Sequence, residues 1–177
     1  MYKINELLKQ DQKLFHTNDL AVIWSTQNRN TLYTTIKRYI KRGILISVYK
    51  GLYSTVSIDK IDPLQLGVAI IHSYTYVTTE TVLAYEGVIS QTIYAYTYVS
   101  EKSQKLTIND QKYLFRKLKK EFLYRNTGIE EKNKVYTASL ERAVADMLYF
   151  NPKYHFDVPG KIDWEKVRFI QKEVGYL

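Results

Sequence analysis

The residues whose chemistry is easiest to interpret lie between positions 29 and 42, in the segment RNTLYTTIKRYIKR. Leu32, Ile36 and Ile40 recur at every fourth position, which predicts a helix with a single buried stripe. The opposite face then carries arginine, lysine, asparagine and threonine. Arginine can bond guanine in bidentate fashion, asparagine can bond adenine, and lysine can neutralise phosphate. This face therefore predicts contact with duplex DNA.

The individual side chains suit different parts of the duplex. Those expected near base edges are Arg29, Asn30, Thr31, Thr34 and Arg38. Those expected at phosphates or in the last, basic turn are Thr34, Thr35, Lys41 and Arg42. Lys50 follows at the tip of a hairpin and can reach an adjacent groove or the backbone. The alternative is a solvated basic face on an ordinary helical hairpin, with Tyr33 and Tyr39 as packing residues.

The first sixty residues are expected to position this helix within a winged helix-turn-helix domain, residues 1–60. Ile4, Leu7, Leu8 and Phe15 indicate the apolar face of a first helix, and Thr17 is the expected N-cap of a second. Gly43 is suited to end the third helix. The remaining ranges are the second helix at 18–24, the third from 29 or 30 to 42, and a hairpin of strands 44–49 and 52–56.

Positive charge is concentrated in this same part of the chain. The 177 residues carry a formal net charge of +8. Residues 1–60 hold ten lysines and arginines against four acidic residues, a net of +6, and residues 61–177 hold sixteen against fourteen, a net of +2. A basic segment suits a polyanionic partner, because each neutralised phosphate releases condensed counterions.

Residues 61–177 predict a separate α+β domain with an antiparallel sheet and several helices. Ser139 is the expected cap of a helix over 140–150, Asp163 caps a helix over 164–174, and Gly175 ends it. The other expected elements are a helix from Pro63 to Ile71, a helix at 80–85, and strands at 76–78, 92–100, 105–108, 113–118 and 134–137.

A second basic feature runs from Gln111 to Arg125, with six cations against Glu121 alone. It could track nucleic acid or contact an acidic partner. A solvated edge strand protected by lysines explains it equally well.

Catalytic chemistry is not expected, so the prediction is a protein that is not an enzyme and uses neither cofactor nor metal. The chain lacks cysteine, its histidines have no ligand spacing, and it has no glycine-rich phosphate loop. Glu141 and Asp146 are five residues apart and fall on different helix faces, whereas Arg142 and Asp146 should pair. The alternatives to a DNA-binding protein are a metal-dependent nuclease and a protein-interaction module. No apolar run is long enough to span a bilayer and no signal peptide is visible, so a cytoplasmic location without membrane contact is expected.

Four stretches, in order along the chain, resemble the AbiEi family of antitoxin-like transcriptional regulators from bacterial abortive-infection (type IV toxin–antitoxin) systems. They are LFHTNDLAVIW at 14–24, NTLYTTIKRYIKRGIL at 30–45 with KGLYS at 50–54, YVTTETVLAYEGVISQ at 76–91, and LERAVADMLYFNPKYHFD at 140–157.

The resemblance implies a winged-helix repressor that binds inverted repeats in its own promoter. A homodimer is the usual arrangement on such a site, because the half-sites lie about one helical turn apart. It also implies a C-terminal domain that neutralises a nucleotidyltransferase-like toxin encoded beside it, without a stable complex.

Overall fold

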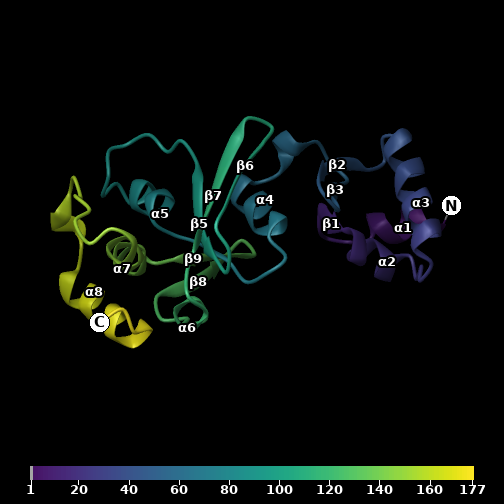
Figure 1. The fold of residues 1–177 in the computed structure, drawn as a ribbon. Coiled ribbons are helices and arrows are strands. Elements are labelled where there is room, and N and C mark those ends of the chain that lie inside the picture. The colour runs from purple at the N-terminus through teal and green to yellow at the C-terminus, as the bar shows by residue number, and fades with distance from the viewer. Residues whose placement is uncertain (1) are drawn as a thin grey trace. The chain divides into compact units, whose positions relative to one another are not determined.

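The structure is a computed structural model that describes residues 2–177. It has a mixed α+β fold, as predicted, and separates into two compact units, one up to Asp62 and the other Pro63–Leu177 (Figure 1). Each unit has its own sheet. Within the described range, every helix is too short or too polar to cross a bilayer.

The first unit alternates helices with short strands around a small antiparallel sheet. Its elements are α1 (Tyr2–Leu8), β1 (Leu14–His16), α2 (Thr17–Ile23), α3 (Arg29–Lys41), β2 (Ile46–Tyr49), β3 (Leu52–Ser54) and a 3-10 turn at Ile58–Lys60. The predicted hairpin is confirmed as β2 and β3. Strand β1 was not predicted, and it pairs with β3 to give the order β1-β3-β2.

The sequence predicts Phe15 on the apolar face of the first helix, but the residue lies in strand β1. It pairs with Tyr53 and is completely buried. Leu8, also expected on that face, is 68% exposed. A three-residue strand has too short a pattern to be recognised, and its partner lies 38 positions further along the chain.

The start of α2 also differs from the prediction. The cap residue is His16, whose backbone N–H donates to the Asp19 carboxylate over 2.7 Å. Thr17, the expected cap, is the first helical residue, and its backbone N–H donates to the carbonyl of Gly51 over 2.9 Å. The hairpin turn is thus fastened to the N-terminus of α2.

One hydrophobic core holds the helices of this unit together. Its buried members are Leu7, Phe15, Leu20, Trp24, Leu32, Ile36, Tyr39, Leu45 and Tyr53. Trp24 meets Tyr39 edge to face with 5.2 Å between ring centroids, and its indole N–H donates to the carbonyl of Lys3 over 3.0 Å. The indole therefore links α1, the end of α2 and the inner side of α3.

The second unit contains a six-stranded sheet and helices on both faces. Its elements are α4 (Pro63–Ile70), β4 (Tyr76–Val77), α5 (Glu80–Tyr85), β5 (Tyr96–Ser100), β6 (Gln104–Ile108), β7 (Gln111–Lys117), α6 (Lys120–Leu123), β8 (Ile129–Lys132), β9 (Val135–Ala138), α7 (Leu140–Phe150), a 3-10 turn at Pro159–Lys161, and α8 (Trp164–Val174). The caps predicted at Ser139 and Asp163 are confirmed, as is the left-handed Gly175. Helix α6 and strand β8 were not predicted, and residues 92–95, expected in a strand, precede it.

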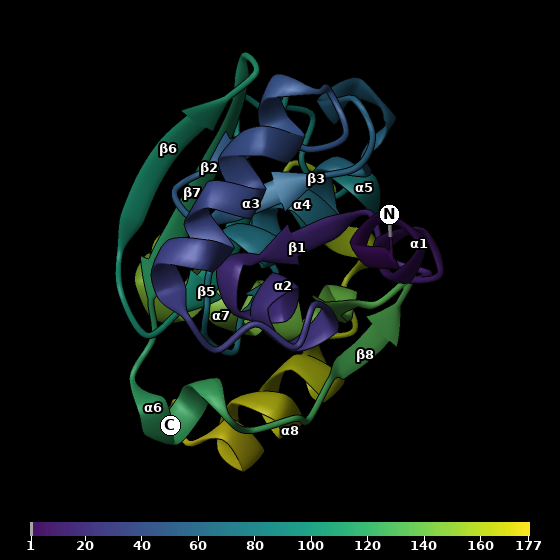
Figure 2. The same cartoon turned by 90° about the vertical axis from the view of Figure 1, so that its right-hand side faces the viewer.

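The sheet is mixed, so the prediction of an antiparallel sheet is wrong. Its order is β6-β7-β5-β4-β9-β8, and the pairs β5–β7 and β4–β9 are parallel. Figure 2 shows β6 at the outer edge of this sheet, next to β7. The short turn after β5 suggests that β6 should lie beside it, but β7 takes that place. Phe115 of β7 stacks on Tyr98 of β5 with centroids 4.9 Å apart, so the more aromatic strand occupies the interior and β6 the edge.

Helices cover the two faces of this sheet unequally. Helix α4 lies on one face, and α5 and α7 lie on the other (Figure 1). Gly67 of α4 stands directly over the Tyr98 ring, where the Cβ atom of any other residue would overlap it. The hydroxyl of Tyr98 donates to the carbonyl of Leu64 over 3.1 Å. The absence of a side chain at Gly67 thus allows α4 to lie close to the sheet.

The predicted pair of Arg142 and Asp146 is confirmed and forms the centre of a buried polar network. Both side chains are fully buried, and Arg142 Nε donates to Asp146 Oδ1 over 2.8 Å. Asp146 also accepts hydrogen bonds from the hydroxyls of Tyr76 (3.0 Å), Thr78 (2.8 Å) and Tyr176 (2.6 Å). Burial lowers the pKa of the Arg142 guanidinium, but Asp146, Tyr76 and Tyr176 together outweigh burial, and the pKa is raised. Arg142 therefore stays charged inside the fold.

Replacing Asp146 with alanine is expected to destabilise the protein by about 3–5 kcal/mol, because it leaves a buried guanidinium without its counter-charge. The free energy of unfolding can be measured by urea denaturation followed by circular dichroism. Glu141→Ala is the matched control on the same helix: its carboxylate pairs with Lys166 at 3.2 Å, and that lysine side chain is 55% exposed. It should cost about 1 kcal/mol or less. Equal losses for the two variants would contradict the central role of Asp146.

Candidate nucleic-acid interface

Helix α3 is fixed at its start by a side-chain cap. Asn28 accepts a hydrogen bond from the backbone N–H of Thr31 over 3.1 Å, which satisfies one of the free donors of the first turn. Gly43 follows the helix with φ of +70°, as the sequence predicts. The helix is therefore defined from Arg29 to Lys41 by local sequence.

The inner face of α3 is rotated relative to the predicted stripe. The buried residues are Leu32, Thr35, Ile36 and Tyr39, while Ile40 is only half-buried. A strict four-residue spacing turns by about 40° at each step, so a row of such residues leaves the buried face. Alternating spacings of three and four stay on it, which places Tyr39 inside in preference to Ile40.

This rotation overturns one predicted DNA contact. Thr35 was expected on the outer face, but it is 6% exposed, and its hydroxyl donates to the carbonyl of Thr31 over 2.8 Å. A side chain that faces the core and bonds its own helix cannot reach phosphate. Thr35 is therefore a structural residue.

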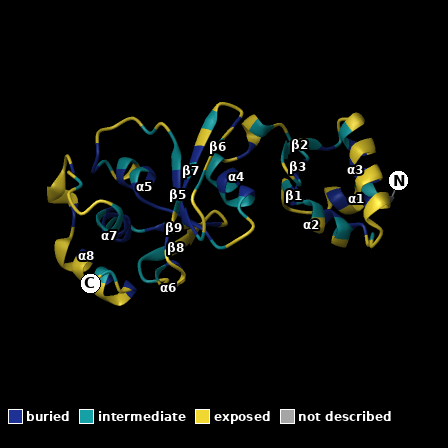
Figure 3. Cartoon of the chain, in the orientation of Figure 1, coloured by how far each residue is buried: buried dark blue, intermediate teal, exposed yellow. Residues whose placement is uncertain are grey.

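The other predicted contact residues are exposed along the outer side of α3 and at the hairpin turn (Figure 3). They are Arg29, Asn30, Thr31, Thr34, Arg38, Lys41, Arg42 and Lys50. Lys37 was not named from the sequence, yet it lies on the same exposed side, three positions after Thr34. Tyr33, expected to pack, is 47% exposed. The exposure of Tyr33 follows from the buried face of Leu32, Thr35, Ile36 and Tyr39, and could not be derived from the predicted stripe.

The positive charges of this surface are not neutralised within the chain. Across residues 2–177, no carboxylate lies within salt-bridge distance of Arg29, Lys37, Lys41, Arg42 or Lys50, and α3 has no acidic residue. The guanidinium of Arg38 lies 5.8 Å from the ring centre of Tyr39. These cations therefore remain available to an external anion.

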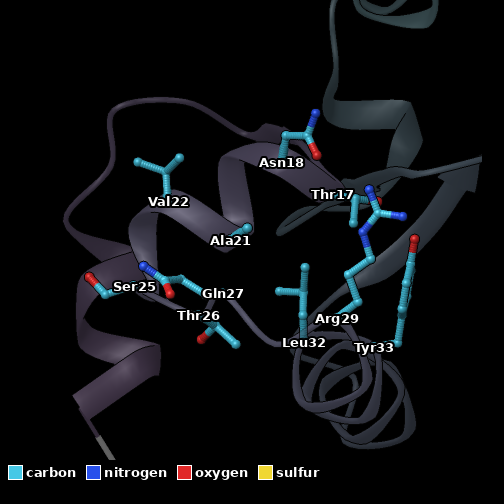
Figure 4. Close-up of a pocket in the computed structure, with 10 residues that line it drawn as sticks. All are labelled: Thr17, Asn18, Ala21, Val22, Ser25, Thr26, Gln27, Arg29, Leu32 and Tyr33. Atoms are coloured by element: carbon cyan, nitrogen blue, oxygen red, sulfur yellow. The ribbon is translucent and has the colours of Figure 1, made fainter.

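A groove between α2 and α3 borders this surface (Figure 4). Asn18 and Val22 project from α2, and Arg29 and Tyr33 project from α3, with Gln27 in the connecting turn. Val22 is 78% exposed despite its apolar side chain. Sequence reasoning missed Asn18, Val22 and Gln27, although the helical spacing of Asn18 and Val22 places them on one face of α2.

The hairpin turn presents Lys50 and is held in place by its neighbours. Gly51 has φ of +71°, and a Cβ atom there would approach the Thr17 hydroxyl to 3.3 Å. The carbonyl of Gly51 accepts the backbone N–H of Thr17 over 2.9 Å. Lys50 is exposed. The turn therefore holds this cation beside the start of α2.

The second basic segment, Gln111 to Arg125, does not form an edge strand, which corrects that alternative. Its strand β7 lies between β6 and β5. Arg116 binds Glu80 through both carboxylate oxygens at 2.6 and 2.5 Å, while Lys112, Lys117, Lys119 and Lys120 are exposed. The exposed lysines of this segment are therefore not explained by protection of an edge strand.

The acidic and histidine residues are dispersed. In the part of the chain that the structure describes, no three histidines or carboxylates gather where they could hold a metal ion. Asp146 is committed to Arg142, and Asp157 accepts the backbone N–H of Ser90 over 2.6 Å.

No protein-family model matches this chain, and no curated protein shows significant sequence similarity to it. The function is therefore inferred from its residues and their arrangement. Three features of the first unit bear on function: the exposed cations of α3, the groove between α2 and α3, and Lys50 in the hairpin turn.

Removing the cap of α3 should loosen the exposed basic surface. Asn28→Ala is expected to destabilise the first unit by about 1 kcal/mol, because a free N–H loses its acceptor. Asn28→Asp should keep most of that stability, since a carboxylate also accepts the bond and favours the helix N-terminus. Thermal unfolding followed by circular dichroism measures both. The cap would be unimportant if alanine and aspartate behaved alike.

Proposed function

We propose that the first unit is a winged helix-turn-helix domain that binds duplex DNA through α3. The observation that carries this proposal is the exposed outer face of α3, which has several cations, no acidic residue and no ion-pair partner among the described residues. An ordinary solvated helix generally mixes both signs of charge. A face of one sign, beside short hydrogen-bonding side chains, suits a polyanion with readable edges.

The order of elements supports this assignment. Helices α2 and α3 are joined by a short turn, and the hairpin β2–β3 follows α3 directly. Strand β1 pairs with β3, so the hairpin belongs to a three-stranded sheet that is tied to the start of α2. In this arrangement α3 is the recognition helix, and Lys50 lies at the tip of the wing.

Base contacts are assigned to the exposed face of α3 from Arg29 to Arg38, and phosphate contacts to Lys41 and the hairpin turn. Arg29, Asn30 and Thr34 have exposed side chains near the N-terminus, where a recognition helix comes nearest to base edges. Val22, exposed beside them, offers an apolar contact for a thymine methyl group. Lys41 and Lys50 contact phosphates and fix the register without reading sequence.

The protein acts as a repressor that binds as a homodimer to an inverted repeat in its own promoter. This part of the proposal comes from the resemblance to the AbiEi family. The geometry requires half-sites about 34–36 Å apart, or a multiple of that distance, so that both recognition helices enter the major groove on one side of the duplex.

Two substitutions should separate base reading from phosphate binding. Arg38→Ala should weaken binding to the native promoter by about 1–3 kcal/mol and relax specificity at one base position, whereas Lys41→Ala should weaken binding to all sequences alike. Lys41→Ala should also reduce the slope of log K against log salt by about 0.9, the contribution of one phosphate. Fluorescence anisotropy with a labelled promoter duplex measures both quantities.

The matched control for these variants is Lys9→Ala, which removes an exposed cation of the same unit that pairs with Glu6 at 3.1 Å. It should leave affinity and salt slope unchanged. If all three variants bind like the parent, or if promoter binding does not depend on salt, α3 does not contact DNA.

The second unit is proposed to act as the antitoxin domain against a nucleotidyltransferase-like toxin. Support comes from the two resembling stretches, which form α5 with the strand before it and α7 with the loop after it. They also supply Tyr76, Arg142 and Asp146 of the buried network. These three residues are buried and stabilise the domain. The residues that act against the toxin are therefore expected elsewhere, on the surface of the second unit.

Co-expression tests this antitoxin role directly. Cells that express the toxin gene adjacent to this one should recover growth when residues 1–177 are supplied in trans. A variant with Arg38→Ala and Lys41→Ala should lose repression but still restore growth, because the two roles are assigned to different units. The antitoxin role would be wrong if toxicity persisted at equal protein levels.

We assign no catalytic activity to the protein. The rival function of a metal-dependent nuclease would require acidic residues that converge, but Asp146 is held by Arg142 and Glu141 by Lys166. A pure protein-interaction module would not need the unpaired cations of α3. DNA binding explains more of the exposed residues than either rival.

A further inference from the structure

The hairpin formed by β6 and β7 has one face of buried side chains and one face of exposed side chains, which is called the open face. Lys105 pairs with Leu114, and Thr107 pairs with Lys112, so these four residues share a face. Tyr113 and Phe115 point the other way and are buried. Lys105, Thr107 and Lys112 are exposed. The open face is therefore rich in lysine.

The cations of this hairpin differ in how they are compensated. Arg116 is bound to Glu80 through two hydrogen bonds. Burial raises the pKa of Glu80, but its bonds and attraction to Arg116 outweigh burial and lower it, so the pair is ionised and neutral overall. Lys105, Lys112 and Lys117, by contrast, have no carboxylate within salt-bridge distance anywhere in residues 2–177.

Three neighbouring hollows lie along this hairpin, and together they are called the groove. The first is bordered by Lys112 and Tyr94, the second by Leu114 and Tyr94, and the third by Leu114, Lys105 and Lys117. Shared lining residues join each hollow to the next. The facing wall consists of residues 91–95 and, at the far end, Phe150. Strand β7, along which the hollows lie, spans seven residues and is therefore about 20 Å long.

Exposed tyrosine rings stand at one end of the groove. Tyr94 is 81% exposed and Tyr85 is 62% exposed, and both border the hollow beside Lys112. Both rings therefore present much of their surface to solvent at the same hollow. A ring face offers a stacking surface for a flat partner.

We propose that this groove binds single-stranded nucleic acid. The lysines of β6 and β7 would follow the phosphate backbone, and Tyr94 and Tyr85 would stack on bases. A basic groove that tracks a backbone, combined with aromatic platforms, is how sequence-tolerant single-strand binding is achieved. The site is independent of α3 and of the duplex binding proposed above.

An acidic peptide is the competing occupant, because the lysines would attract it equally. Acidic side chains, however, offer no flat surface that could stack on the tyrosine rings beside the lysines. Asp110 borders the groove at the tyrosine end and would repel either occupant alike. The rings therefore favour nucleic acid.

Binding of fluorescein-labelled oligo(dT) and oligo(U), each of about twelve nucleotides, to the full chain tests the proposal. Tyr94→Ala should weaken binding about tenfold, which corresponds to the loss of one stacked base. The double variant Lys105→Ala/Lys112→Ala should reduce the slope of log K against log salt by about 1.4, since each single-strand phosphate contributes about 0.7.

The matched control for charge is Lys153→Ala/Lys172→Ala, which removes two exposed lysines outside the groove and should keep the parent slope. Arg38→Ala/Lys41→Ala should leave oligonucleotide binding intact, and Tyr94→Ala should leave promoter binding intact, so either site can fail alone. The proposal is overturned if no binding is measured, if α3 variants abolish it, or if poly-glutamate competes equally and Tyr94→Ala has no effect.

Discussion

The burial of one stripe of α3 is the constraint on which the first unit depends. A helix can hide only one side, and here Leu32, Ile36 and Tyr39 turn that side toward Trp24 and Phe15. Every cation of the helix is then left in solvent. No acidic side chain is available to α3 within its own sequence. The same packing that stabilises the unit therefore creates a positive surface, and it fixes the direction in which that surface points relative to the turn between β2 and β3.

The second unit is organised by a different constraint, a charged pair in its interior. Arg142 and Asp146 form a fully buried pair, and tyrosine hydroxyls and backbone carbonyls make further hydrogen bonds to it. Burial and the charge of Asp146 raise the pKa of Tyr176, which keeps its hydroxyl protonated and donating. In the sheet, β7 lies in the interior with Tyr113 and Phe115 buried, and β6 lies at the edge. The burial of these aromatic side chains leaves the lysines of β6 and β7 on the surface.

Sequence reasoning succeeded where a residue acts on its near neighbours. Ser139, Asp163 and Gly43 were identified because caps and left-handed residues act within one turn. The pairing of Arg142 with Asp146 is likewise local, but the hydroxyls of Tyr76 and Tyr176 come from distant segments. Strand β1, the parallel pairs and the interior position of β7 depend on partners tens of residues away. Thr35 was misplaced because a four-residue spacing was extended past the point where helical geometry allows it. The groove residues Asn18 and Val22 became visible only once α2 and α3 were placed side by side.

Amide chemical shifts report, residue by residue, which surface of a protein contacts DNA. The measurement is a titration of the ¹⁵N-labelled full chain with an unlabelled promoter duplex, followed by heteronuclear NMR. The account predicts that shifts concentrate at 29–42 and at Lys50 and Gly51, with the inner residues Leu32 and Ile36 moving less than Arg38 and Lys41. Shifts confined to residues 63–177, or a spectrum unchanged by saturating duplex, would contradict it.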